Sequence, residues 1–244
     1  MNLPIGFDKC LTFINCHMKP APGGRGGAHP EGKEFRWRAV TISRESGSGA
    51  HVVAEKLLEN LNQFPDGLMG KWAIFDKNLV EKVIEDHHLP KRLAQFLRED
   101  RASQLSDTLD ELFGLHPPTE ELVRKCADTV LQLSDLSRVI IIGRGGAVIT
   151  AQMPHVLHVR LIAPLDERIK YLQQVTGRNE KAALHLIHEE DGARRRYLKR
   201  YFGKNIDDPL LYHMVLNTHQ LGYDGAAKAI THTLQTEMAL ETVA

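Results

Sequence analysis

The sequence has few cysteines, no net charge and no long hydrophobic run, and each of these absences excludes a class of protein. Its three cysteines (Cys10, Cys16 and Cys126) are odd in number and form no CxxC pattern, which excludes a disulfide scaffold and favours a reducing, cytoplasmic location. No apolar stretch approaches the roughly 18 residues that a membrane-spanning helix needs. The 31 basic and 31 acidic residues balance, which argues against a dedicated nucleic-acid-binding or membrane-surface protein.

The chain is long enough for one large domain with an appendage. Its 244 residues are 42% hydrophobic and 25% charged, which are ordinary values for a globular protein. Residues 1–34 are predicted to be the appendage: a short amphipathic helix followed by a flexible linker, PAPGGRGGAHPEG. The folded domain is expected over residues 35–244. The sequence contains no internal repeat, and it leaves the oligomeric state open.

Apolar, strand-like runs alternate with helical patterns along this domain. Strands are predicted near residues 39–43, 72–75, 139–142, 155–162 and 212–218, and the last helix from about Asp224. Near-continuous apolar strands imply burial on both faces. The predicted fold class is therefore α/β: a three-layer domain with a parallel sheet between helices.

The first glycine turn, Ser46-Gly47-Ser48-Gly49-Ala50, lies between the first predicted strand and its helix. Ligands of open α/β sheets bind outside the carboxyl ends of the strands. Successive backbone N–H groups at a helix N-terminus favour an anion such as phosphate. The turn therefore predicts either a phosphate site or, as the simpler alternative, a tight strand–helix connection that binds nothing.

Two further elements carry basic side chains. Arg144 lies among Gly143, Gly145 and Gly146 directly after the apolar run VIII, and its planar guanidinium suits bidentate phosphate contacts. The second is the run 194–200, RRRYLKR, which contains no acidic residue. It is either a solvated helix face or a basic segment that closes over phosphates.

The thirteen histidines do not predict a metal site. His155 and His158 are expected on opposite faces of a strand, so they cannot chelate together. His185 and His188 can share a helix face, but no third ligand accompanies them. Cys126 lies in a helical pattern and is expected to be a core thiol rather than a nucleophile.

Five segments, in this order, resemble the cytidylate-kinase-like family of P-loop nucleoside-monophosphate kinases. They are VTISRESGSGAHVVAEKLLENL, FDKNLVEKV, IIIGRGGAVI, LIAPLDERIKYL and EEDGARRRYLKRYFGKNIDDPLLYHMVLNT. The similarity runs from about Arg38 to the last helix, which is most of the chain. It implies a phosphate loop, an acceptor region over about residues 76–134 and an arginine-bearing lid over about 189–208.

The resemblance also implies an activity: ATP-dependent phosphoryl transfer to a nucleoside monophosphate, with CMP as one candidate acceptor and Mg²⁺ accompanying ATP. Such transfer depends on positioning and charge neutralisation. By resemblance, the ATP-binding residues are Ser46, Gly47, Ser48, Gly49, Ala50 and His51; the acceptor-binding residues are Asp76, Arg144 and Arg168; and the catalytic residues are Arg44, Arg194, Arg195 and Arg200.

The loop departs from the usual pattern GxxxxGK[ST]. Arg44 stands at its first glycine, Ala50 at its lysine and His51 at its hydroxyl residue. Losing one preorganised charged donor typically costs about 10²–10³ in rate, although Arg44 or a lid arginine could supply the missing charge. The alternative function is therefore a catalytically inactive nucleotide- or phosphate-binding regulatory protein. An RNA-binding module built on the linker and the lid is a weaker alternative.

Overall fold

The computed structural model describes residues 37–63, 72–76 and 120–235. Within these residues five strands form a parallel sheet of order β2-β3-β1-β4-β5. The strands are β1 (Ala39–Arg44), β2 (Ala73–Phe75), β3 (Val139–Ile142), β4 (Val156–Ile162) and β5 (Met214–Asn217). Each lies in a segment where the sequence predicts a strand, so the α/β prediction is confirmed.

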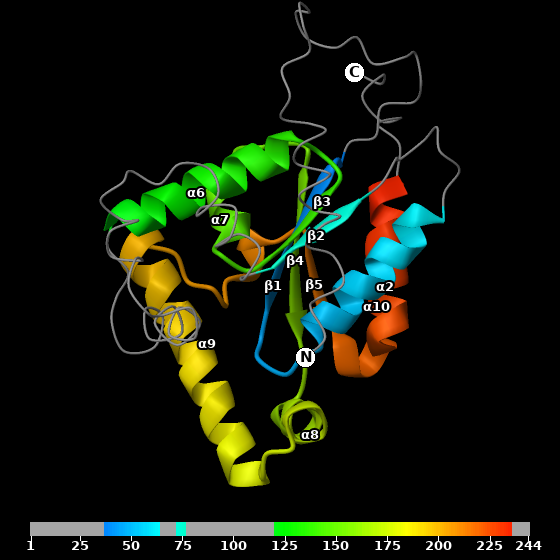
Figure 1. The fold of residues 1–244 in the computed structure, drawn as a ribbon, viewed down its shortest axis with the longest axis vertical. Coiled ribbons are helices and arrows are strands. Elements are labelled where there is room, and N and C mark those ends of the chain that lie inside the picture. The colour runs from blue at the N-terminus through cyan, green and yellow to red at the C-terminus, as the bar shows by residue number, and fades with distance from the viewer. Residues whose placement is uncertain (1–36, 64–71, 77–119, 236–244) are drawn as a thin grey trace, which may run out of the picture.

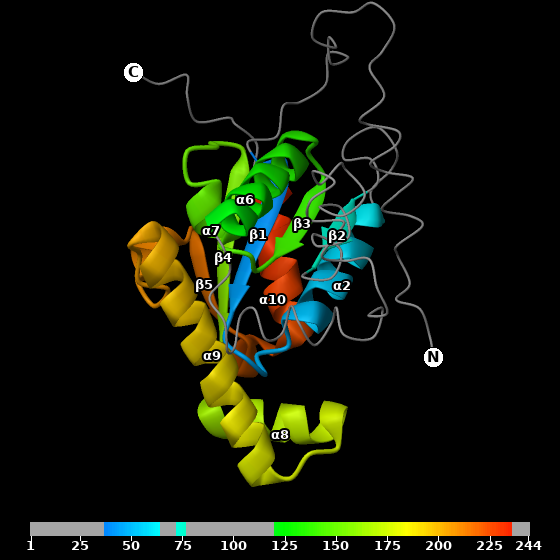
Figure 2. The same ribbon diagram turned by 60° about the vertical axis from the view of Figure 1, so that its left-hand side comes forward.

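Helices cover both faces of this sheet (Figures 1 and 2). On one face α2 (Ala50–Asn62) and α10 (Thr218–Gln235) pack side by side over strand residues such as Val40 and Ile42. On the other face α6 (Glu120–Asp135) packs over residues such as Ala39 and Ile141, with the short helix α7 (Gly146–Ile149) beside it. Alternate strand residues therefore enter opposite core layers, as a sheet buried on both sides requires. Cys126 lies buried in the second layer, as predicted.

A helical hairpin extends beyond the carboxyl ends of the strands (Figure 1). It consists of α8 (Leu165–Thr176) and α9 (Glu180–Phe202), which bury Ile169 and Leu172 against Ala183 and Ile187. The side chain of Asn179 caps α9 by accepting a hydrogen bond from the N–H of Ala182 (2.9 Å). The basic run 194–200 thus lies on one continuous helix, which packs on α8 near its start and on Val123 of α6 and Val148 of α7 near its end.

The last helix begins earlier than predicted. Its first turn, at Thr218, is capped by the Asn217 side chain, which accepts a hydrogen bond from the N–H of His219 (3.1 Å). Gly222 then interrupts the helix with φ 67° and ψ 163°, and the regular helix continues past Asp224. The sequence pattern identified the longer, second part and missed the capped first turn.

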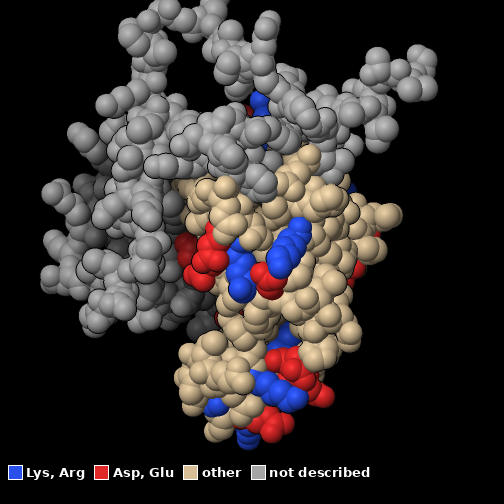
Figure 3. Space-filling model, turned by 90° about the vertical axis from the view of Figure 1, so that its right-hand side faces the viewer, with Lys and Arg blue, Asp and Glu red and all other residues tan. Residues whose placement is uncertain are grey.

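Several predicted segments lie outside the described residues. These are the appendage of residues 1–34 and most of the acceptor region, of which Asp76 and α6 are described. In the described part of the chain, no helix has the length and apolarity that crossing a bilayer demands. On the face shown in Figure 3, the described basic and acidic side chains lie next to one another rather than in a patch of one sign.

Candidate functional site

The two glycine turns lie side by side at one edge of the sheet. Strands β1 and β3 are neighbours, with Ile42 and Ile142 paired in register. The N–H of Gly143 donates a hydrogen bond to the carbonyl of Ile42 (2.9 Å), which joins the ends of the two strands. The turn that follows β1 and the turn that follows β3 therefore begin at neighbouring points of this edge.

The first turn depends on its glycines. Gly47 and Gly49 have φ of 81° and 76°, a region that side chains disfavour. A Cβ on Gly47 would overlap the backbone of Arg168, and a Cβ on Gly49 would overlap the ring of Tyr223. Ser48 fixes the turn from within, because its Oγ donates a hydrogen bond to the carbonyl of Glu45 (2.8 Å).

This turn presents a row of backbone donors. Within the described residues, the N–H groups of Gly47, Gly49, Ala50 and His51 have no acceptor, and no side chain caps the start of α2. Unsatisfied donors at the positive end of a helix form an anion site. Burial and the nearby Arg44 lower the pKa of His51, which favours its neutral ring.

A cavity of about 920 Å³ opens at the carboxyl ends of β1 and β3. It is bounded by these strand ends, the second glycine turn and one side of α9, and its apolar walls include Val148, Tyr197, Leu198 and Ile206. Four arginines line it: Arg44, Arg144, Arg194 and Arg196. The loop residues 46–51 lie beside the cavity and do not line it.

The guanidinium of Arg44 lies directly over Gly143, in space that a Cβ at residue 143 would occupy. Burial, and then repulsion by Arg194, lower the pKa of Arg44 to about 9, while Glu190 partly opposes this effect. Within the described residues, no acceptor lies within hydrogen-bond or ion-pair distance of this guanidinium. An anion in the cavity would therefore favour the charged guanidinium, which burial disfavours.

Arg144 adopts a backbone conformation that is unusual for its residue type. Its φ is 55°, and it stands between Gly143 and Gly145, which also have positive φ. Holding a non-glycine residue there costs about 1–3 kcal/mol, and such strain concentrates at functional sites. Burial lowers the pKa of Arg144 to about 10, opposed by Tyr197 and Asp76. Asp76 therefore lies within electrostatic reach of the cavity arginines.

Arg168, predicted to bind the acceptor, lies beneath the first glycine turn and does not line the cavity. Its Nη1 donates hydrogen bonds to Asp191 Oδ2 (2.6 Å) and to the carbonyl of Ser46 (3.2 Å). Its Nε lies 3.7 Å from a carboxylate oxygen of Glu45. These contacts join α8, α9 and the loop, so in this structure Arg168 holds the loop in place.

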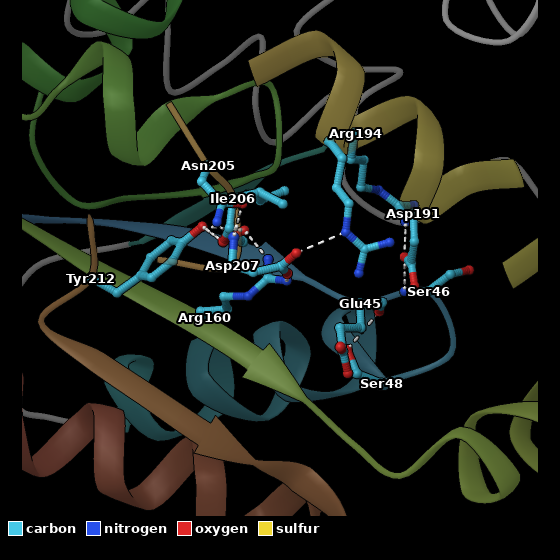
Figure 4. A network of polar contacts seen from close by, with 12 residues as sticks. Glu45, Ser46, Ser48, Arg160, Asp191, Arg194, Asn205, Ile206, Asp207 and Tyr212 are labelled. Carbon is cyan, nitrogen blue, oxygen red and sulfur yellow. Dashed lines mark hydrogen bonds and ion pairs between the residues drawn. The ribbon is translucent and has the colours of Figure 1, made fainter. Parts of the chain in front are cut away.

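The three arginines predicted on the lid have different surroundings. Arg194 lines the cavity, and one Nη atom donates to Asp191 (2.9 Å; Figure 4). Its other Nη atom donates to Glu190 (2.7 Å). Arg195 is exposed and donates from Nε to Asp207 (2.8 Å). Arg200 is also exposed, and neither it nor Arg195 lines the cavity. Of these three arginines, only Arg194 reaches the candidate site.

Sequence reasoning missed Glu190, Arg196, Tyr197 and Tyr212, which also border the cavity. The first three lie on α9 with the predicted Arg194. Residues 190, 194 and 197 follow the i, i+4, i+7 spacing of one helix face, and Tyr197 is buried. That spacing could have identified the face of α9 that borders the cavity.

The family model and the solved structure with the higher TM-score support this description of the fold. The model of the cytidylate kinase-like family matches residues 39–220. The crystal structure of an uncharacterized protein from Eubacterium ventriosum superimposes with a TM-score of 0.59 at 21% identity, over 81% of this chain and 97% of that one. Shikimate kinase from Bacteroides thetaiotaomicron gives a TM-score of 0.48 at 12% identity, over 82% of this chain and 99% of that one.

One curated protein of a different named activity matches a smaller part of this chain. The uronate isomerase of Corynebacterium glutamicum is 28% identical over 94 residues, which are 38% of this chain and 18% of that protein. The family match, in contrast, takes in both glycine turns, the cavity and α9. The chain therefore belongs to the cytidylate kinase-like family, and its fold is a parallel sheet between helices.

Proposed function

We propose that this protein is a nucleotide phosphotransferase that transfers a phosphoryl group from ATP to a nucleoside monophosphate, with CMP as one candidate acceptor. The observation that carries the proposal is the adjacency of two anion-binding features at one sheet edge. One is the row of N–H donors at residues 47–51, and the other is the cavity lined by Arg44, Arg144 and Arg194. Phosphoryl transfer needs two such sites in contact, one for each reacting phosphate.

The proposed roles follow from position. The N–H row holds the phosphates of ATP, while Arg144 and Arg44 hold the phosphate of the acceptor, with Asp76 beside them. Arg194, between loop and cavity, neutralises the group in transfer. Arg44 is a buried cation directly before a loop whose lysine position holds the buried, neutral Ala50. Arg195 and Arg200 would reach the phosphates only if α9 moved.

Magnesium would accompany ATP and neutralise charge on the transferring group. Mg²⁺ in such sites takes one or two carboxylates together with substrate phosphates and water. Glu190 and Asp191 provide carboxylate oxygens next to Ser46, so the residues present suit it. Among the described residues, no group of three or more His, Cys, Asp and Glu side chains is arranged to hold a metal without a substrate.

The proposal is tested by calorimetric titration with Mg–ATP and with each nucleoside monophosphate, followed by chromatography of the products. Arg44→Gln should weaken acceptor binding about tenfold or more, because a hydrogen bond to a charged group contributes about 1.5–3 kcal/mol. Arg178→Gln, which removes the same charge from an exposed position at the α8–α9 turn, is the matched control. Absence of both binding and diphosphate product in the wild-type protein would refute the proposal.

A second candidate function is a regulatory protein that binds a phosphorylated ligand without turnover. It is favoured by Ala50 at the lysine position and by the two carboxylates that already contact Ser46. The same experiment separates the two candidates: saturable ligand binding with no diphosphate product after prolonged incubation would support the regulator.

A further inference from the structure

The phosphate loop and the cavity share a wall formed by two side chains of α9. Glu190 and Arg194 both line the cavity. On its other side Glu190 accepts a hydrogen bond from the Oγ of Ser46 through Oε2 (2.6 Å), and the same oxygen accepts from Arg194 Nη2 (2.7 Å). Figure 4 shows Arg194 and Asp191 on α9 facing Ser46 of the loop.

The first donors of the loop are thus already bound to carboxylates. The N–H of Ser46 donates to Asp191 Oδ1 (2.8 Å), and its hydroxyl donates to Glu190. The guanidinium of Arg194 is equally committed, because its two Nη atoms donate to these same two carboxylates. A phosphate that reached Ser46 would meet two negative charges, and the nearest arginine of α9 would be neutralised.

The two carboxylates differ in how firmly they are held. The side chain of Asp191 is 9% exposed and also pairs with the buried Arg168 (2.6 Å), so it belongs to the framework beneath the loop. The side chain of Glu190 is 40% exposed, and among the described residues its hydrogen bonds are with Ser46 and Arg194. Glu190 is therefore the carboxylate that can leave at the lower cost of the two.

We propose that Glu190 acts as an internal competitor for phosphate: it occupies the Ser46 hydroxyl and Arg194 until the terminal phosphate of a polyphosphate ligand takes over both contacts. Ligand binding would thereby release Glu190 and make Arg194 available at the cavity. The inference rests on the proposed phosphate-binding role of the loop. It identifies the ligand class as one that carries enough negative charge to displace a carboxylate, such as a nucleoside triphosphate or inorganic tripolyphosphate.

The test compares Glu190→Gln with Glu189→Gln in the full chain. Both variants remove one negative charge at the cavity, but the Glu189 side chain is 64% exposed and lies near His185 (3.2 Å) rather than at the loop. Binding of inorganic tripolyphosphate is measured by calorimetry in magnesium-free buffer. The Glu190 variant should bind on the order of tenfold more tightly than wild type, and clearly more tightly than the Glu189 variant. Equal affinities of the two variants, or weaker binding by Glu190→Gln, would overturn the proposal.

A double-mutant cycle with Arg194→Gln tests the exchange of partners. Removing Arg194 should have little effect on tripolyphosphate affinity while Glu190 is present, and should cancel most of the gain in the Glu190→Gln background. An equal loss in both backgrounds would contradict the exchange. If tripolyphosphate binds to none of the variants, nor to wild type, the proposed phosphate site itself fails. If wild type binds and the cycle is additive, only the role of Glu190 fails.

Discussion

The guanidinium of Arg44 occupies the space that a side chain at residue 143 would fill. The two residues end neighbouring strands, so their contact follows from the β1–β3 register. The absence of a side chain at Gly143 thus has two consequences: the residue can adopt a φ of 82°, and the Arg44 guanidinium can lie over its Cα. Because Arg44 stands where a phosphate loop usually has its first glycine, the missing Cβ at residue 143 compensates for a large side chain at residue 44.

Gly143→Ala should therefore lower both stability and anion binding. The positive φ alone should cost about 1–2 kcal/mol, and displacement of Arg44 should weaken phosphate binding about as much as Arg44→Gln does. Gly177→Ala is the matched control, because Gly177 has a φ of 68° and nothing within 4 Å of its Cβ position. Urea unfolding and phosphate titration of both variants check the prediction. Equal phosphate affinities in the two variants would show that the Arg44 position does not matter.

Asp191 is the centre of the network beneath the loop, and its removal should be strongly destabilising. It accepts hydrogen bonds from Ser46 N, Arg168 Nη1 and Arg194 Nη1. Asp191→Ala would leave the guanidinium of Arg168, whose side chain is 10% exposed, without its close partner. The loss of a partner from a buried ion pair costs about 3–5 kcal/mol. The midpoint of urea unfolding measures this cost.

The control for this prediction is Asp224→Ala. Asp224 forms an ion pair with Lys228 (2.7 Å) on the outer side of α10, where both side chains are mostly exposed. Exposed pairs of this kind contribute little, so its removal should leave the unfolding midpoint unchanged. Equal unfolding midpoints of the two aspartate variants would mean that the ion pairs of Asp191 contribute no more to stability than an exposed pair does.

The elements and the positions of the two turns could be predicted because they depend on local pattern. The apolar runs at 39–43 and 139–142 became β1 and β3, and the glycines after them became the turns. A buried apolar run followed by glycine and then by apolar residues at helical spacing predicts a strand, a turn and a helix of a parallel α/β sheet. Both glycine turns were therefore visible in the sequence, and the sheet order placed them at neighbouring strand ends.

The pairing of charged residues could not be predicted in the same way. Ser46 and Glu190 are 144 positions apart, and several arginines compete for each carboxylate. Arg168 and Arg195 were expected at phosphates, and the structure pairs them with Asp191 and Asp207 instead. In a run of consecutive arginines, each side chain points about 100° from the next around the helix. Which one reaches the cavity therefore depends on how α9 packs, and that is a tertiary property.

His158 provides a last test, on stability rather than binding. It is 5% exposed on β4, its Nδ1 lies 2.9 Å from Thr41 Oγ1, and its ring stacks on that of His213. Burial, and then the neighbouring His213, lower the pKa of His158 to about 4, while Thr150 partly opposes the shift. The unfolded chain, with a histidine pKa of about 6.5, binds more protons between these two values. The stability contribution of neutral His158 is therefore complete above about pH 6.5 and is lost as the pH falls toward 4.

The free energy of unfolding should accordingly fall by about 2 kcal/mol between pH 7 and pH 5 from this residue alone. His158→Gln keeps a hydrogen-bonding side chain and removes the titration, so its stability should be lower at pH 7 and depend less on pH. Urea unfolding at several pH values between 7 and 5 compares the two slopes. Parallel slopes for wild type and variant would mean that His158 titrates in the folded protein as it does in the unfolded chain, and that the packing of β4 against β1 leaves its ring open to water.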